Sequence, residues 1–264
     1  MDIVPSDAAL GAEIRDLDLS LHLSEEQVVD LHTALLDHGV LVFRDQHITD
    51  EDQVRFTRYF GPPVEHVRKQ RQRRVKEIFI ISNVKENGEP IGALGSELID
   101  FHSDLSYLPK PGTISLLYAV EIPAEGGDTQ WCDCRAAYDS LPRQRQDYLR
   151  TLRAVHRHYV EEQNPPEPTV HPVVRTHPVT GRKCLFVNPT FTSHIKDVST
   201  AESEAILGYL YAHMVQPEFI CRRRWSQGDV GMWDNRCTMH YAIADYGDAN
   251  RVIHRTTLVG DIPV

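Results

Sequence analysis

The sequence lacks several features that would point to a membrane, a secretion route or a nucleic acid. No apolar stretch approaches the roughly 18 residues that a membrane span requires, so we expect no membrane partner. The first residues, MDIVPSDAALGAEIRD, are acidic and lack the basic, then apolar, layout of a signal peptide, which favours a cytoplasmic location. Lys and Arg number 28 against 38 Asp and Glu, giving a net charge of -10, and this deficit argues against nucleic acid as a partner.

Cysteine is also scarce, and its spacing is uninformative for metal binding. The chain has five Cys, an odd number, which does not indicate a disulfide framework. Cys132 and Cys134 form a C-x-C, but the paired C-x-x-C spacing of a zinc site is missing. We therefore predict free thiols, several of them on buried strands.

No internal repeat or low-complexity linker divides the chain, so we predict a single domain over residues 1–264. Capping residues and spacing predict helices between Ser24 and Gly39, from Asp50 to Phe60 after Thr49 with Gly61 as the stop, and around 135–151 and 199–215. A short strand is predicted at 40–45, and many strand-like runs punctuated by Gly, Pro, Asn and Asp follow between 77 and 260. This pattern predicts a mainly β fold with flanking helices, an antiparallel sandwich or jelly roll.

A basic run, VRKQRQRRVK at 67–76, stands out against the acidic total. Such a run is most often a solvated loop or strand face. The functional alternative is a positively charged lip over a site for an anion.

The segment FHSDLSY offers the first candidates for chemistry. His102 and Asp104 are two residues apart, and in an extended strand such residues project from the same face. His240, in WDNRCTMHYA, is the natural third ligand, since two His and one carboxylate form the set used by non-haem Fe(II) oxygenases. On its own the motif is weak, because 14 His make an H-x-D triplet easy to find by chance, and an ordinary surface or turn pair remains open.

Further along, RVIHRTTLVGD strengthens the metal hypothesis. Arg251, Ile253 and Arg255 would share one strand face, and guanidinium groups that point inward are costly unless anions meet them. Arg binds a carboxylate bidentately, as the far carboxylate of 2-oxoglutarate would require. Two arginines facing outward are the alternative.

With these residues the sequence resembles the taurine dioxygenase and 2,4-dichlorophenoxyacetate dioxygenase family of Fe(II)/2-oxoglutarate enzymes. The resemblance covers nearly the whole chain, in the blocks LGAEIRDLDLS, GVLVFRDQHITDEDQ, FHSDLSYLPKPG, GGDTQWCDCRAAYDSLP, HPVVRTHPVTGRKCLFVN, WDNRCTMHYAIADY and RVIHRTTLVGD. It implies a double-stranded β-helix (jelly roll) core, and Fe(II), 2-oxoglutarate and O2 as cofactor and cosubstrates. It also implies a homo-oligomer, either a dimer or a tetramer.

The resemblance also implies roles for individual residues. His102, Asp104 and His240 fall on the three iron ligands, which would be the catalytic centre. Thr129 and Arg251 fall on the residues that hold the far carboxylate of 2-oxoglutarate. Arg255 and His66 fall on contacts to the substrate's acidic group. Phe191 and Trp233 lie where the family packs aromatic side chains near the site, with core packing as the plainer alternative.

Departures from the taurine enzyme bear on the substrate. Glu97 and Leu98 stand where that enzyme has an Asp-Asn pair for the substrate amine, and Lys69 stands where it has Tyr. Leu98 replaces an amide by an apolar side chain, so we expect a small anionic substrate with a more apolar body than taurine, such as a sulfonate, an aryloxy acid or an amino-acid-derived carboxylate.

The resemblance implies hydroxylation with release of succinate and CO2. Because Asp104 keeps the carboxylate that halogenating relatives lack, hydroxylation or oxidative cleavage is favoured, and desaturation stays open. Alternatives are a carrier-tethered substrate docked by residues 68–76, a cupin-like isomerase or a dioxygenase without cosubstrate, and a non-catalytic protein that binds metal and 2-oxoglutarate.

Overall fold

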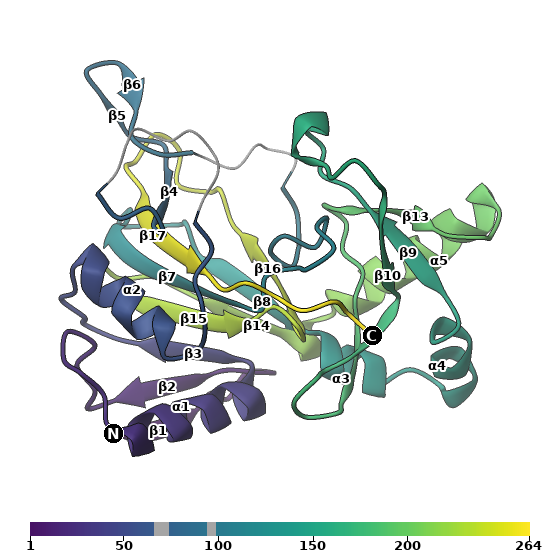
Figure 1. The fold of residues 1–264 in the computed structure, drawn as a ribbon, viewed down its shortest axis with the longest axis horizontal. Coiled ribbons are helices and arrows are strands. Elements are labelled where there is room, and N and C mark those ends of the chain that lie inside the picture. The colour runs from purple at the N-terminus through teal and green to yellow at the C-terminus, as the bar shows by residue number, and fades with distance from the viewer. Residues whose placement is uncertain (66–73, 94–98) are drawn as a thin grey trace.

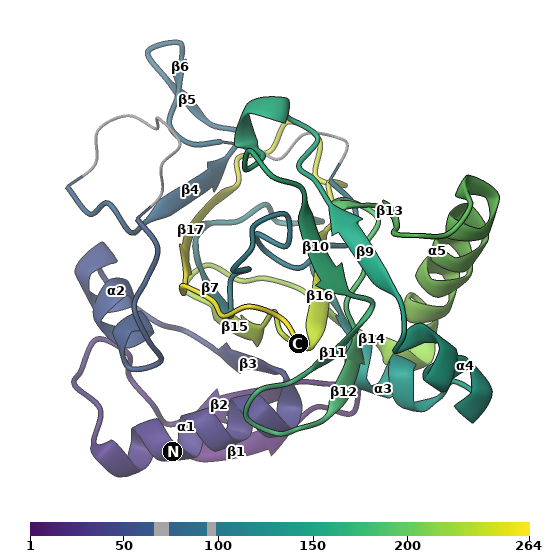
Figure 2. The same ribbon diagram turned by 45° about the vertical axis from the view of Figure 1, so that its right-hand side comes forward.

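The fold is organised around a large and a small β-sheet. A computed structural model describes residues 1–65, 74–93 and 99–264. The large sheet has the strand order β1 (Asp2–Pro5), β2 (Ala12–Arg15), β3 (Val40–Phe43), β15 (Val230–Asp234), β7 (Ile114–Glu121), β17 (Val252–Thr257) and β4 (Phe79–Ser82). The small sheet consists of β14 (Ile220–Arg223), β8 (Thr129–Asp133) and β16 (Thr238–Ala242). Figures 1 and 2 show β7, β15, β17 and β16 grouped at the centre of the protein.

Three smaller pairings complete the described strands. They are β10 (Thr169–Pro172), β9 (Arg153–His156) and β13 (Thr192–Ile195) in one sheet, β11 (Val174–Thr176) with β12 (Lys183–Leu185), and β5 (Lys85–Glu86) with β6 (Glu89–Pro90). Neighbouring strands run antiparallel, except that β2 and β3 are parallel. The predicted mainly β class with a jelly-roll core is confirmed.

Helices lie on the outside of both sheets. They are α1 (Glu25–His38), α2 (Asp50–Arg58), α3 (Cys134–Asp139), α4 (Arg143–Leu149) and α5 (Thr200–Met214), with 3-10 turns η1 (Glu161–Gln163) and η2 (Pro217–Phe219). In Figure 1, α1 and α2 lie beside β1, β2 and β3, while α4 and α5 lie on the side of β9 and β13; α3 contacts β12. No helix within the described ranges is long and apolar enough to cross a membrane.

Alternation along the central strands separates two apolar layers. On β7, Leu116 packs with the α1 and α2 layer, whereas Leu117 belongs to a second cluster together with Trp131 of β8 and Trp233 of β15. Successive side chains of a strand point to opposite faces, so one strand supplies both layers. Ser115 of β7 is on the same face as Leu117, which carries its hydroxyl into the interior between the sheets.

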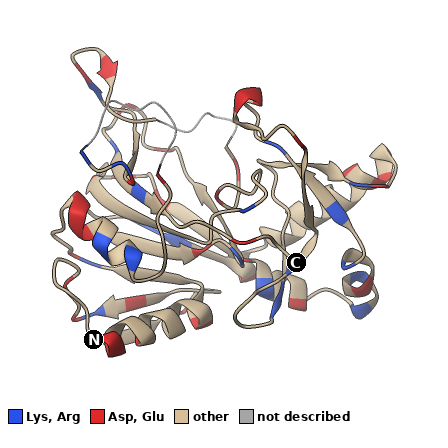
Figure 3. Cartoon of the chain, viewed as in Figure 1, with Lys and Arg blue, Asp and Glu red and all other residues tan. Residues whose placement is uncertain are grey.

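The predicted helix starts are confirmed at their caps. The Ser24 side chain accepts a hydrogen bond from the Gln27 amide, and Gly39 ends α1 with a φ of 73°, a value that favours glycine. Thr49 caps α2 in the same way. Figure 3 shows acidic residues (red) at the start of α2 and basic residues (blue) nearer its end, an order that complements the helix dipole.

Two predicted helix lengths are wrong. The second helix ends at Arg58 rather than Phe60, with Tyr59 as its C-cap. The helix predicted around 135–151 is two helices, α3 and α4, separated at Pro142. Proline has no amide hydrogen and disfavours helical backbone in the residue before it, so α3 stops and α4 restarts.

The cysteine prediction is confirmed. All five cysteines are free and buried, and Cys132, Cys184 and Cys221 lie on strands.

Candidate active site

A cavity of about 910 Å³ opens between the sheets. The residues predicted from the sequence to hold the metal or an anion that line it are His102, Asp104, Thr129, His240, Arg251 and Arg255. They come from four separate parts of the chain, so the tertiary fold brings the predicted metal ligands and the predicted anion-binding residues to one place.

The three predicted metal ligands converge at one wall of this cavity. Their ligand atoms all lie within 4.8 Å of one another, and Nε2 of His102 is 3.9 Å from Oδ1 of Asp104. The backbones of His102 and His240 form an isolated antiparallel bridge, with N···O distances of 3.0 and 2.8 Å. The expected regular strand through both His102 and Asp104 is wrong, because Asp104 lies in a turn in which Leu105 has a φ of 59°.

The protonation states at this wall suit a divalent metal ion. Burial lowers the pKa of His102, and burial lowers that of His240 to about 3, so both imidazoles are neutral. Burial alone would raise the pKa of Asp104, but its polar neighbours, the guanidinium of Arg255 foremost, outweigh burial and hold the pKa below its usual range. Metal ligands must be deprotonated, and all three groups meet that requirement.

Hydrogen bonds direct the free lone pairs of the imidazoles. Nδ1 of His102 lies 2.9 Å from the Asp100 carbonyl oxygen, an acceptor, so this nitrogen carries the proton and Nε2 keeps its lone pair. Nδ1 of His240 is buried and has no hydrogen-bond partner among the described residues. One ring nitrogen of His240 also lies within 4.8 Å of the ligand atoms of His102 and Asp104, and a buried imidazole without a protein partner at such a place fits a metal ligand.

The Asp104 carboxylate is fixed by its neighbours. Ser115 donates to Oδ2 at 2.6 Å, and Nη1 of Arg255 donates to Oδ1 at 2.8 Å. Asn235 supports both the ligand and the serine, since its Oδ1 accepts from the Asp104 amide at 3.1 Å and its Nδ2 donates to Ser115 Oγ at 2.9 Å. Trp233 Nε1 donates to the same amide oxygen. Oδ2 is therefore held by a hydroxyl, while Oδ1 is held by a guanidinium and lies near Nε2 of His102.

The second group in the cavity is arranged around Arg251. This arginine is buried at 4% exposure, its Nη2 donates to the Gly127 carbonyl at 3.3 Å, and among the described residues no carboxylate pairs with it. Its Nε has no partner in the same part of the chain. Thr129 is equally buried, and its Oγ1 accepts a hydrogen bond from Trp225 Nε1 at 2.9 Å. A buried guanidinium without an acid fits an anionic ligand.

Comparison with known proteins decides the family. The profile of the family described as taurine catabolism dioxygenase TauD, TfdA matches residues 2–257. The chain belongs to this family. It is 36% identical to the alpha-ketoglutarate-dependent 2,4-dichlorophenoxyacetate dioxygenase of Cupriavidus pinatubonensis, over 98% of each chain. It is 34% identical to the alpha-ketoglutarate-dependent sulfate ester dioxygenase of Pseudomonas putida, over 100% of this chain and 91% of the relative.

The fold agrees with that assignment. A solved structure of a taurine dioxygenase from Burkholderia xenovorans superposes with a TM-score of 0.87 at 38% identity, covering 100% of this chain and 92% of that one. The prediction of a TauD/TfdA enzyme, a dioxygenase that depends on 2-oxoglutarate (α-ketoglutarate), is confirmed.

Some of the residues predicted for the TauD/TfdA site make other contacts than expected, and some lie outside the described residues. Arg255 reaches the cavity, but its partner there is Asp104, the predicted metal ligand, and this contact was not predicted from the sequence. Phe191 and Trp233 both line the cavity, and their rings lie 5.6 Å from that of His102 and 4.6 Å from that of His240. Outside the described residues lie His66, Lys69, Glu97, Leu98 and most of the basic run at 67–76.

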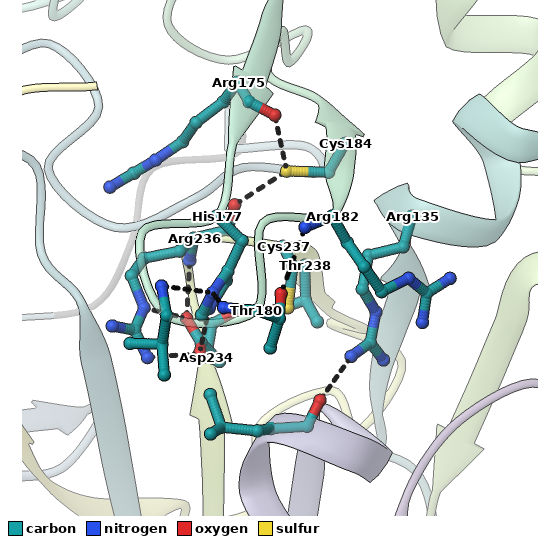
Figure 4. Close-up of polar contacts among 12 residues, drawn as sticks. Arg135, Arg175, His177, Thr180, Arg182, Cys184, Asp234, Arg236, Cys237 and Thr238 are labelled. Carbon is teal, nitrogen blue, oxygen red and sulfur yellow. Dashed lines mark hydrogen bonds and ion pairs between the residues drawn. The ribbon is translucent and has the colours of Figure 1, made fainter. Parts of the chain in front are cut away.

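A second cluster of possible ligands lies outside the cavity and is not suited to a metal. Nδ1 of His177 accepts from the amides of Val179 and Thr180 at 3.3 and 3.2 Å, so its Nε2 carries the proton and donates to Asp234 at 3.0 Å. Burial raises the pKa of the Cys237 thiol, the third member, which keeps its own proton. Figure 4 shows Asp234 held between His177 and Arg236. The cluster clamps the turn between β15 and β16.

The turn between β15 and β16 contains Asn235, so the cluster around Asp234 indirectly supports Asp104. Three supporting residues were not predicted from the sequence: Asn235, Ser115 and Trp225. Asn235 lies inside the family block WDNRCTMHYAIADY, which could have drawn attention to it. Ser115 is a small hydroxyl in the apolar run ISLLYAV, and a polar residue on an inward strand face is a usable signal. Nothing in the local sequence around Trp225 marks it as a partner of Thr129.

Proposed function

We propose that the protein is an Fe(II)- and 2-oxoglutarate-dependent dioxygenase that uses O2 to hydroxylate a small organic anion. The observation that carries this proposal is the arrangement in one cavity of two neutral imidazoles and a carboxylate together with a buried guanidinium that has no acid partner in the described chain. Neither half is decisive alone. Together the two groups suit a dicarboxylic acid that chelates a metal ion with one end and pairs with a guanidinium at its other end.

His102, Asp104 and His240 would hold the iron. Two His and one carboxylate on one face leave positions open for the cosubstrate and O2. When bound, iron and 2-oxoglutarate supply the oxidising chemistry, in which O2 and the cosubstrate yield succinate, CO2 and one hydroxyl group on the substrate. The chain contributes the orientation of the ligands, and Ser115 keeps Oδ2 of Asp104 engaged so that one oxygen is presented to the metal.

Arg251 and Thr129 would hold the far carboxylate of 2-oxoglutarate. The guanidinium offers a charge-assisted donor, and the hydroxyl offers a second one. Both are buried, so the interaction is shielded from water and fixes the cosubstrate in one orientation against the metal.

Arg255 would receive the acidic group of the substrate. Among the described residues that line the cavity, Arg251 and Arg255 are those with a fixed positive charge, and Arg251 is assigned to the cosubstrate. The Nε of Arg255 has no partner in the described chain while its Nη1 contacts Asp104, so a bound acid would lie next to the metal. Phe79, Ile81 and Leu117 give the cavity apolar walls. An anion with an apolar body fits these surroundings, in line with the sulfate ester and aryloxy acid named for the relatives.

Hydroxylation, with oxidative cleavage when the reacting carbon carries a heteroatom, is the outcome we favour. The cytoplasmic location, the homo-oligomeric state and the single domain over residues 1–264 stay predictions from the sequence. A carrier-tethered substrate remains the alternative.

The test is a panel of substrates assayed for succinate release. Full-length protein with Fe(II), 2-oxoglutarate and O2 is given alkyl sulfates, sulfonates, aryloxyacetates, amino-acid-derived carboxylates or carrier-bound acids. We expect at least one free acid with an apolar body to stimulate succinate formation well above the rate without substrate. Asp104→Ala is the control, because it removes a metal ligand at the cavity wall, and it should stay folded and release no succinate.

The alternatives give different results. Stimulation by carrier-bound acids alone would favour the tethered substrate. Binding of 2-oxoglutarate with no succinate from any acid would contradict an enzymatic role, and full activity of Asp104→Ala would reject the ligand assignment.

A further inference from the structure

The hydroxyl of Thr129 has a partner that the cosubstrate site does not itself require. Trp225, in the loop between β14 and β15, donates its indole N–H to Thr129 Oγ1 at 2.9 Å, and both residues are buried. An indole nitrogen can only donate, whereas a hydroxyl has one proton and two lone pairs. In this contact Thr129 must therefore act as the acceptor.

The proton of Thr129 is left for another group. Within the described chain its hydroxyl donates to no protein atom, and Thr129 lines the cavity. A free hydroxyl rotates and can either donate or accept. With one lone pair occupied by the indole on the protein side, the proton is directed to the cavity, where it can serve only an acceptor such as a carboxylate oxygen.

The indole is held in place by close packing. Gly231 of β15 lies directly against it, and a Cβ at that position would be 2.6 Å from Cη2 of Trp225, so only glycine leaves room. Because the donor cannot easily turn, the orientation it imposes on Thr129 is fixed before any ligand binds.

Thr129 and Arg251 share one corner of the cavity. The Arg251 guanidinium contacts the carbonyl of Gly127, two residues before Thr129, and a Cβ on Gly127 would lie 3.3 Å from Arg251 Nε. A fixed hydroxyl donor and a buried guanidinium beside each other form a site for one carboxylate.

We propose that Trp225 is a positioning residue that fixes Thr129 as a hydrogen-bond donor and thereby sets the affinity for the carboxylate of 2-oxoglutarate far from the metal. This inference rests on the proposed function. It adds a residue that touches neither the metal nor the cosubstrate, and it predicts an effect confined to ligands with that second carboxylate.

The test compares Trp225→Phe with Trp131→Phe. Both substitutions shorten a buried indole to a phenyl ring, but the Nε1 of Trp131 has no hydrogen-bond partner among the described residues. Full-length proteins loaded with Mn(II), which serves as the metal probe, are titrated by calorimetry with 2-oxoglutarate and separately with pyruvate. Pyruvate has the same metal-chelating end and lacks the far carboxylate.

We expect Trp225→Phe to weaken 2-oxoglutarate binding by about three- to tenfold, the range for losing one oriented hydrogen bond, and to change pyruvate binding less than about twofold. Trp131→Phe should change neither by more than about twofold. In a Thr129→Val background, Trp225→Phe should have no further effect on 2-oxoglutarate, because the indole acts through that hydroxyl.

Three results would overturn the inference: unchanged 2-oxoglutarate binding in Trp225→Phe, an equal loss for pyruvate, or a full additional loss in the Thr129→Val background. If Trp225→Phe does not fold, 3-benzothienylalanine at position 225 keeps the shape of the indole and replaces its N–H by sulfur. A wild-type protein that binds neither Mn(II) nor 2-oxoglutarate would instead contradict the proposed function.

Discussion

The hydroxyl of Ser115 should determine how tightly Asp104 binds a metal ion. Ser115→Ala removes the donor on Oδ2 of Asp104, which lies at 2.6 Å in a fully buried setting. Asn235 donates to Ser115 Oγ at 2.9 Å and so directs the serine proton to the carboxylate. Without this bond the carboxylate can rotate, and the oxygen presented to the metal is no longer fixed.

The expected magnitude follows from the charge on the acceptor. A hydrogen bond to a charged group contributes about 1.5–3 kcal/mol net, which corresponds to roughly a 10- to 150-fold change in an equilibrium constant. Groups that support metal ligands typically alter affinity by about 10–100-fold. We therefore expect Ser115→Ala to raise the dissociation constant for Mn(II) by about 10–100-fold.

A matched control is available in the same hydroxyl cluster. Thr257 is fully buried, and its Oγ1 lies 3.3 Å from Ser115 Oγ, but among the described residues it makes no hydrogen bond to Asp104. Thr257→Val also deletes one buried hydroxyl and should change Mn(II) affinity by less than about twofold. Free Mn(II) is measured by electron paramagnetic resonance, and the melting temperature of each metal-free variant is recorded. Equal Mn(II) affinities for the two variants would refute the reasoning.

Two further predictions concern the cosubstrate and stability against acid. Arg251→Ala should weaken 2-oxoglutarate binding by at least about 30-fold, because removing one partner of a buried charge pair costs about 2–5 kcal/mol. If the concentration of 2-oxoglutarate required in succinate assays is unchanged, Arg255 is the cosubstrate arginine. Burial lowers the pKa of His171 to about 4, so its contribution to stability is complete above the unfolded-state pKa near 6.5 and is lost as the pH falls from there towards 4, on the order of 3 kcal/mol in all. Denaturant unfolding at several pH values should show a shallower acid loss for His171→Gln, and identical profiles would contradict this assignment.

The sequence by itself determined the features that depend on neighbouring residues. Ser24, Thr49 and Gly39 mark helix ends because capping is a contact within one turn. Alternating apolar residues fix which face of a strand is buried, since successive side chains point to opposite sides. Family blocks identified His102 and His240 as partners, although the expected strand through Asp104 proved to be a turn.

Only the tertiary structure decided which side chains hold the candidate site in place. Asn235 and Asp104 are hydrogen-bonded although 131 residues separate them in the sequence. The separation is 151 residues for Arg255 and Asp104, and 96 for Trp225 and Thr129. Such contacts depend on how the sheets pack and on where a glycine leaves room for an indole, and no local pattern encodes either. Local propensity therefore sets the elements and the family blocks predict the ligands, whereas the packing of distant strands sets the orientation of each predicted ligand.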